Sequence, residues 1–304
     1  MRTPFTGVGS ALVTPFMKNG DLDEAAVRRL ARRQIDAGIH FLCPCGTTGE
    51  SPTLTAAERL RIVDIVVEEA NGKLPILAGA GGYDTKEVIH AAGEMATRGA
   101  SGFLSVTPYY NKPTQEGLYQ HYRAFAESTP LPIVVYNVPG RTGVNVEVST
   151  LVRLAQIPNI VGVKEASGNV SQMCEIRSAV PANFIVLSGD DALTLPLMAV
   201  GGHGIISVAA NEIPAEMVEM VELAERNDFA AARQVHARIL PLMSVNFIES
   251  NPGPVKAAMA AMGLIEEVYR LPMVPPRAES KEKIVKVLKE LGLLNVVTSR
   301  QQLV

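Results

Sequence analysis

One lysine stands out in this 304-residue chain because of the residues that precede it. Of ten lysines, only Lys164 ends a continuous apolar run, which begins at Ile160. A lysine that points inward from a buried strand loses hydration, which favours its neutral form and makes the amine nucleophilic. Neutral amines in such places attack ketones to form Schiff bases. Taken alone, the pattern fits equally well a lysine that extends from the strand end into solvent.

Tyr136 ends another apolar run, which begins at Pro132. Adjacent parallel strands lie about 4.8 Å apart, so side chains that end neighbouring strands can share one pocket. A phenol beside an amine can pass protons to and from a carbinolamine, the intermediate that precedes an imine. Considered by itself, Tyr136 is better interpreted as a core tyrosine with a satisfied hydroxyl.

Two loops offer groups that bind carboxylates. Residues 46–50, Gly-Thr-Thr-Gly-Glu, present consecutive backbone N–H groups and two hydroxyls, although glycine and threonine are common in turns. Arg141 lies in the loop 139–143 and can hold a carboxylate with two hydrogen bonds, although a surface ion pair is the usual role of a loop arginine. The pair Asp190 and Asp191 resembles a metal site, but Asp191 is better interpreted as a helix cap, and we expect no metal.

These groups must be positioned by a repeating framework. Eight short apolar runs bounded by Gly or Pro recur along the chain: Gly9–Val13, Ile39–Cys43, Pro75–Ala78, Gly102–Val106, Pro132–Tyr136, Ile160–Lys164, Phe184–Leu187 and Gly204–Val208. Nearly continuous apolar strands indicate a parallel sheet buried on both faces. Segments with helical periodicity separate them, one of which follows the capping box Thr55-x-x-Glu58. The pattern predicts an α/β fold, a (β/α)₈ barrel, whose catalytic groups lie at the carboxyl ends of the strands.

The remainder of the chain is predicted to be helical. We expect the eighth barrel helix near 214–226 and three further helices near 228–243, 254–262 and 280–291. The predicted domains are therefore a catalytic barrel, 1–227, and a small C-terminal helical domain, 228–304. Residues 192–211 lack charged side chains, but Pro196 and the glycines at 201, 202 and 204 interrupt them. We interpret them as a helix, a turn and a buried strand, not a membrane span.

Composition excludes several classes of protein. Apolar residues make up 47% and charged residues 19%, which excludes a disordered or collagen-like chain. The net charge of −3 provides no basic field for nucleic acid or an anionic membrane, so we expect small-molecule partners or further copies of the chain. The N-terminus shows no signal or transit peptide, which predicts a cytoplasmic protein. Cys43, Cys45 and Cys174 indicate neither a disulfide framework nor a zinc site.

Together, these segments resemble the dihydrodipicolinate synthases (4-hydroxy-tetrahydrodipicolinate synthases) of the pyruvate-dependent class I aldolase superfamily. The matching motifs are GTTGES (46–51), TPYYNKPTQEGLYQHY (107–122), YNVPGRTG (136–143), GVKEASGN (162–169), LSGDD (187–191) and GGHGIISV (201–208). They occur in the same order, and the resemblance covers nearly the whole chain. The resemblance implies condensation of pyruvate with L-aspartate 4-semialdehyde in the diaminopimelate and lysine pathway, without a metal or organic cofactor.

The resemblance also implies roles for individual residues. Lys164 would form the Schiff base with pyruvate, and Tyr136 would relay protons, linked through Thr47 to Tyr110. Tyr110 in this family reaches into the site of a neighbouring subunit. The expected assembly is therefore a homo-oligomer, a tetramer built as a dimer of dimers. The residues implied to bind substrate are Thr48 for the pyruvate carboxylate, Arg141 for the semialdehyde carboxylate, and Gly189 and the Ile206 carbonyl as pocket lining.

Feedback regulation is the point at which the sequence departs from part of this family. Members inhibited by lysine bind it with groups that correspond here to Ser51, Glu87 and Tyr109, which are the candidate allosteric residues. The strongly inhibited bacterial type has histidines on the following helix. Here, the corresponding residues are Ala56 and Arg59, with Tyr83 in place of a small amide. Because Arg59 would repel the ammonium groups of lysine and Tyr83 would fill its space, we expect weak or absent inhibition.

Three alternative functions were weighed against this one. A related lyase for N-acetylneuraminate or a 2-keto-3-deoxy sugar acid would retain Lys164 and Tyr136, but it has less use for Arg141 than a short acid aldehyde has. A non-catalytic keto-acid-binding barrel has no use for a buried nucleophile beside a proton relay. A metal-dependent aldolase needs a cluster of histidines and carboxylates at strand ends, whereas of five histidines only His203 lies near such an end, and it precedes its strand.

Overall fold

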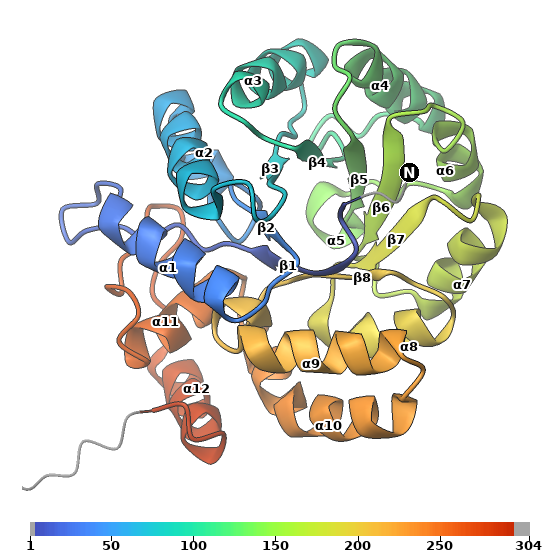
Figure 1. Cartoon of the computed structure of the whole chain (residues 1–304). Helices are drawn as coiled ribbons and strands as arrows, with labels where there is room; N and C mark the ends of the chain where they lie inside the picture. The colour runs from blue at the N-terminus through green and yellow to red at the C-terminus, as the bar shows by residue number, and fades with distance from the viewer. Residues whose placement is uncertain (1–3, 295–304) are drawn as a thin grey trace, which may run out of the picture.

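The computed structural model describes residues 4–294, and eight parallel strands form its centre (Figure 1). The strands are β1 (Gly7–Ala11), β2 (Phe41–Cys43), β3 (Leu77–Gly79), β4 (Gly102–Val106), β5 (Ile133–Asn137), β6 (Ile160–Glu165), β7 (Ile185–Ser188) and β8 (Gly204–Ser207). Each strand pairs with its sequence neighbours, β8 pairs with β1, and a bridge between Leu42 and Ile76 joins β2 to β3. The sheet therefore closes into the predicted (β/α)₈ barrel.

The predicted strands all exist and differ from the observed ones only at their ends. The fourth strand has the predicted bounds, and the others shift by one or two residues. The charge-free stretch 192–211 forms helix α8 (Thr194–Ala199), a turn and strand β8, as expected. Among residues 4–294, no helix combines the length and apolar character that a bilayer crossing needs.

Helices surround the barrel, and polar caps explain where several of them begin. The outer helices are α1 (Glu24–Asp36), α2 (Ala56–Ala70), α3 (Thr85–Thr97), α4 (Gln115–Glu127), α6 (Val148–Leu154), α7 (Val170–Ala179), α8 and α9 (Pro214–Glu225). Thr55 and Glu58 form the predicted reciprocal capping box of α2. Asp23, Asp84 and Asn169 accept backbone N–H bonds at the starts of α1, α3 and α7.

The amino-terminal end of the barrel interior is filled by two aromatic rings. Phe5 and Phe41 are fully buried and meet edge to face, with ring centroids 5.6 Å apart. A Cβ at Gly9 would lie 2.1 Å from the Phe41 ring, and one at Gly102 would lie 2.8 Å from Phe5. Glycine is therefore needed at both positions. With this end packed, the polar interior side chains gather at the carboxyl ends of the strands.

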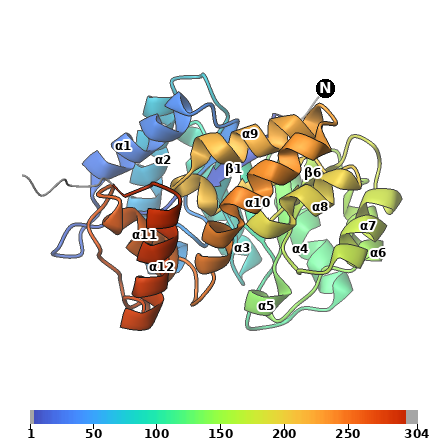
Figure 2. The ribbon, with the colours of Figure 1, turned by 90° about the horizontal axis from the view of Figure 1, so that it is seen from below.

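Three C-terminal helices pack on one side of the barrel (Figure 2). They are α10 (Phe229–Val245), α11 (Gly253–Ala261) and α12 (Ala278–Glu290), close to the predicted ranges. Helix α10 lies along α9, and apolar residues of α10 and α12 belong to the same buried cluster as the outer face of the barrel. The division at 227/228 stays a prediction, because the apolar packing is continuous across it.

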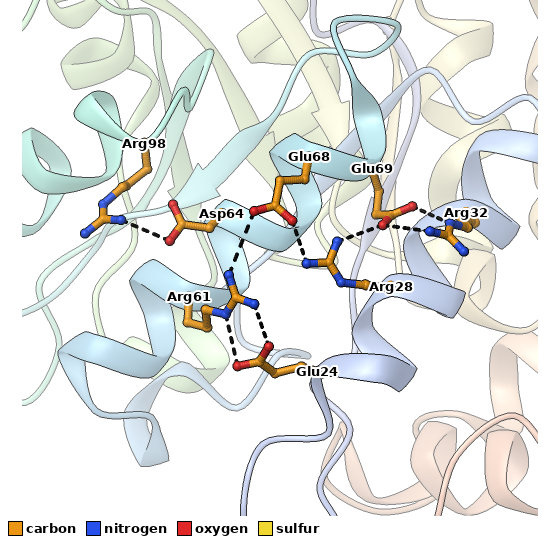
Figure 3. Close-up of polar contacts among 8 residues, drawn as sticks. All are labelled: Glu24, Arg28, Arg32, Arg61, Asp64, Glu68, Glu69 and Arg98. Atoms are coloured by element: carbon orange, nitrogen blue, oxygen red, sulfur yellow. Dashed lines mark hydrogen bonds and ion pairs between the residues drawn. The ribbon is translucent and has the colours of Figure 1, made fainter.

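Ion pairs connect the first three helices on the surface (Figure 3). Arg28 of α1 lies 2.5 Å from Glu68 of α2, and Arg61 of α2 lies 2.6 Å from Glu24 of α1. Arg98, which follows α3, lies 3.0 Å from Asp64 of α2. Exposed pairs of this kind each contribute about 0–1 kcal/mol, so the network helps to fix helix positions more than it stabilises the fold.

Candidate active site

Lys164 and Tyr136 lie side by side at the carboxyl end of the barrel. They are register partners on β6 and β5, and the Lys164 Nζ atom lies 4.4 Å from the centre of the Tyr136 ring. Their side chains are nearly buried, with exposed fractions of 5% and 7%. Among the described residues, no carboxylate lies within ion-pair distance of Lys164. The structure therefore places a buried amine against a phenol, with no anion to neutralise its charge.

The space around the Lys164 side chain depends on a glycine from the next strand. Gly189 follows β7, and a Cβ at that position would lie 3.0 Å from the Lys164 Cε atom and 2.5 Å from the Ala166 Cβ atom. Any side chain larger than glycine would thus displace the lysine. Ile206 lies on β8 in the buried cluster of the barrel interior that also contains Tyr136.

The loop 46–51 follows β2 and folds as a tight turn. The Gly49 N–H donates to Gly46 O at 3.1 Å, and the Glu50 N–H donates to Thr47 O at 3.1 Å. Glu50 has φ = +53°, in the left-handed region that non-glycine residues seldom occupy. Thr47 borders a cavity of about 260 Å³ that Tyr136 and Arg141 also line. The turn therefore brings a threonine to the same cavity as the phenol.

Arg141 and Thr48 contact one residue from the C-terminal region. Arg141 lies on the short helix α5 (Pro139–Thr142), and its Nη2 atom donates to Asn251 O at 3.0 Å. The Asn251 side-chain amide donates to Thr48 Oγ1, also at 3.0 Å. Because the threonine oxygen accepts this bond, its own hydrogen is available for a carboxylate.

The fourth predicted catalytic residue lies outside this cavity. Tyr110 is 93% exposed, has φ = +72°, and is not among the residues that line the cavity. The neighbouring Tyr109 does line it, and its ring meets Tyr83 edge to face at 5.4 Å. Burial raises the pKa of Tyr109 above its usual value. Tyr136 therefore contacts Lys164 and shares the cavity with Thr47, whereas neither Lys164 nor Tyr110 is among the residues that line it.

The candidate allosteric residues divide in the same way. Ser51 and Tyr109 line the cavity beside Arg59, whereas Glu87 lies in the first turn of α3 and does not.

The interpretation of Asp191 as a helix cap is wrong. Asp190 makes the cap, accepting from the Ala192 N–H at 2.9 Å. Asp191 is buried and accepts from Ser207 Oγ and from the N–H groups of Val208 and Ala209. Asp190 and Asp191 are both suited to cap a helix. The hydrogen bonds of Asp191 to the end of β8, which is distant in sequence, leave Asp190 as the cap.

Sequence analysis missed a second buried lysine. Lys256 on α11 is fully buried, and its Nζ atom lies 2.5 Å from Glu50 Oε1. Its neighbours supplied a usable signal, because Pro254, Val255 and the run Ala257–Ala261 are small or apolar and indicate a buried helix. Asn251 was missed as well, and no local pattern distinguishes it.

The remaining reactive groups near the site are thiols. Cys43 lies in the barrel interior, and burial raises its pKa to about 12, so it stays protonated at neutral pH. Within residues 4–294, there is no group of three or more His, Cys, Asp or Glu side chains that could hold a metal ion.

Comparison with known proteins shows the family of the chain. Residues 4–291 match the model of the dihydrodipicolinate synthetase family. The 4-hydroxy-tetrahydrodipicolinate synthase of Koribacter versatilis is 54% identical over 97% of this chain and 99% of its own length. A solved structure of a monomeric dihydrodipicolinate synthase variant is 47% identical and has a TM-score of 0.94, covering 96% of this chain and 98% of the other.

A further solved structure is that of a chloride-inhibited dihydrodipicolinate synthase from Acinetobacter baumannii, complexed with pyruvate. It is 41% identical, with a TM-score of 0.94, over 96% of this chain and all of the other. The match extends through the barrel and the C-terminal helices together. On this evidence, the chain belongs to the dihydrodipicolinate synthetase family.

Proposed function

We propose that this protein is a 4-hydroxy-tetrahydrodipicolinate synthase, a lyase that condenses pyruvate with L-aspartate 4-semialdehyde. The observation that carries the proposal is the buried Lys164 amine, which lies against the Tyr136 ring and has no anionic partner within residues 4–294. Relatives near 50% identity over almost the whole chain carry this name. We assign this reaction to the pathway that forms diaminopimelate and lysine.

The reaction begins at the Lys164 Nζ atom. The neutral amine attacks the keto carbon of pyruvate to form a carbinolamine, which loses water to leave a protonated imine. The positive imine acidifies the methyl group, and loss of a proton gives an enamine. The enamine carbon then attacks the aldehyde carbon of the semialdehyde, whose oxygen takes up a proton. Finally, the amino group of the semialdehyde attacks the imine carbon, closes the ring and releases Lys164.

Proton transfer is assigned to groups around this amine. The Tyr136 hydroxyl takes and returns the protons of the carbinolamine steps, assisted by Thr47, which borders the same cavity. Tyr110 completes the relay from a second copy of the chain. Its exposure in the single chain supports this assignment, because such a side chain is free to enter a neighbour's site. The active assembly is accordingly a homo-oligomer, a tetramer built as a dimer of dimers.

The carboxylates of the two substrates are assigned to different groups. Thr48 donates its hydroxyl hydrogen to pyruvate, and Arg141 holds the carboxylate of the semialdehyde. Gly189 keeps the space beside Lys164 open, and the Ile206 carbonyl lines the pocket. We place the protein in the cytoplasm, where the three free cysteines remain reduced.

Borohydride reduction tests the Schiff base. Incubation with pyruvate and borohydride, followed by peptide mass mapping, should place a reduced pyruvate adduct on Lys164. The Lys164→Ala variant, incubated in the same way, is the control and should not be modified at residue 164. An unmodified Lys164 in the wild-type protein, or labelling unchanged in Lys164→Ala, would exclude this mechanism and favour a keto-acid-binding barrel.

A further inference from the structure

The loop 46–51 is held by a segment more than two hundred residues away in the sequence. Within this loop, Thr48 accepts from the Asn251 amide, and Glu50 receives the Lys256 ammonium. Both contacting residues belong to the segment 251–256, which contains the first turn of α11. Thr47, which directly precedes Thr48, borders the cavity. The C-terminal segment thus holds Thr48 and Glu50, and the cavity-lining Thr47 is the residue next to Thr48 in the same turn.

Lys256 lies in an enclosed site formed by one carboxylate and two aromatic rings. Its side chain is fully buried and that of Glu50 is 1% exposed. The ammonium lies 4.3 Å from the centre of the Phe16 ring and 5.3 Å from that of Tyr269. Burial lowers the pKa of Lys256, and Glu50 opposes that shift. A buried ion pair with this geometry has a fixed position, because neither charge can leave without exposing the other to an apolar interior.

The position of Glu50 sets the position of Thr47. Glu50 donates its N–H to Thr47 O, and its own carbonyl accepts from the Thr53 N–H at 2.9 Å. The adjacent Gly49 carbonyl accepts from Thr14 Oγ1 at 2.7 Å. A carboxylate drawn toward α11 therefore holds the backbone of the whole turn, including a residue at φ = +53° that would otherwise relax.

We propose that Lys256, acting through Glu50, is a positioning residue for the pyruvate carboxylate. It does not touch the substrate. It holds the turn that presents the Thr47 and Thr48 hydroxyls and backbone N–H groups at one spacing. This role rests on the proposed function, and it assigns to the C-terminal helical region a part in substrate binding.

The test measures the pyruvate concentration that gives half-maximal borohydride trapping on Lys164. Two variants are used in the full-length protein. Glu50→Gln combined with Lys256→Met removes both charges, so no unpaired ion remains buried. Glu50→Asp keeps both charges but shortens the carboxylate by one methylene, so the turn must shift to retain the pair. A shift of the turn by about 1 Å can lower the efficiency of a reaction by roughly a hundredfold. We therefore expect the half-saturating pyruvate concentration to rise by about tenfold or more in both variants.

A control separates positioning from general loss of stability. Asn159 precedes β6 at the opposite end of the barrel, where its amide donates to the carbonyls of Ala126 and Thr129. Asn159→Ala should lower the melting temperature and leave the half-saturating pyruvate concentration unchanged. In the Glu50 and Lys256 variants, that concentration should rise while trapping at saturating pyruvate stays complete.

Each outcome decides a different statement. A wild-type half-saturation value in both Glu50 variants, whatever their melting temperatures, would overturn the positioning role and leave a purely structural ion pair. A rise in Asn159→Ala equal to that in the variants would also overturn it. Wild-type protein that does not trap pyruvate at all would instead refute the proposed function.

Discussion

The two buried lysines show how their surroundings give one side chain two uses. Lys164, at the mouth of the barrel, has a tyrosine ring beside it and no carboxylate within ion-pair distance among the described residues. Lys256, on α11, has two aromatic rings and a carboxylate 2.5 Å away. Burial lowers the pKa of Lys256, and Glu50 opposes that shift. The Glu50 carboxylate holds the Lys256 amine in a fixed position, whereas the Lys164 amine has no ion-pair partner within residues 4–294 and is available as a nucleophile.

Identical substitutions at the two lysines test this comparison most directly. Lys164→Met should lower the rate of condensation by roughly 10³-fold or more, because the covalent step is lost. Its unfolding free energy should stay equal or rise by about 1 kcal/mol, since a buried amine without an ion pair is replaced by an apolar chain. Lys256→Met should destabilise the protein by about 3–5 kcal/mol, because Glu50 is left charged and buried.

Urea denaturation and steady-state rates distinguish the two sites. Equal destabilisation by Lys164→Met and Lys256→Met, or wild-type stability of the Lys256 variant, would contradict the proposed difference between the two lysines. Glu50→Gln combined with Lys256→Met serves as the matched control, and it should recover most of the stability lost in Lys256→Met alone.

Asp191 extends the comparison to carboxylates, because it is buried with hydrogen-bond donors and forms no ion pair with any residue between 4 and 294. Burial raises its pKa from 3.8 to about 6. The folded state therefore binds this proton more tightly than the unfolded state, and stability should rise as the pH falls from about 6 to about 4. The shift corresponds to about 3 kcal/mol at most. The measurement is the difference in unfolding free energy between wild type and Asp191→Asn across this range, and a difference independent of pH would contradict it.

Arg141 tests whether the two substrates are held by separate groups. Arg141→Ala should raise the KM for aspartate semialdehyde, or lower kcat, by roughly ten- to a hundredfold, because a charge-assisted pair contributes about 1.5–3 kcal/mol. Trapping of pyruvate on Lys164 should stay nearly intact. Unchanged kinetics with the semialdehyde would reassign the second substrate, and a polyhydroxylated keto acid would then be the next candidate.

Much of the barrel and part of the site could be predicted because their signals are local. A strand buried on both faces consists of a nearly continuous run of apolar residues, which predicts all eight strands. The residues at the strand ends then follow from the barrel fold. Lys164 and Tyr136 are such residues, and the register of β5 and β6 places them opposite each other.

The contacts with the C-terminal region could not be predicted in this way. Glu50 and Lys256 are 206 residues apart, and neither sequence segment indicates the other. The capping role of Asp190 depended on contacts of its neighbour with Val208 and Ala209. The role of Tyr110 rests on family resemblance alone, because a single chain leaves that side chain exposed.

The smallest expected effect concerns lysine and the cations that surround the cavity. Arg59 lies beside Ser51 and Tyr109 along the cavity wall, and Tyr83 packs against Tyr109. Because a bound lysine would carry an ammonium toward this guanidinium, we expect feedback inhibition to be weak or absent. Arg59→Ala removes the repulsion, which amounts to about 1 kcal/mol, so inhibition by lysine should strengthen by roughly fivefold.

Activity titrated against lysine in both proteins measures this effect. Asn159→Ala, which changes the far end of the barrel, should respond to lysine as the wild type does. Strong inhibition of the wild-type enzyme at submillimolar lysine would mean that other groups bind the inhibitor. An Arg59→Ala enzyme no more sensitive than wild type would assign the weak response to the volume filled by Tyr83, because charge would then have no measurable part in it.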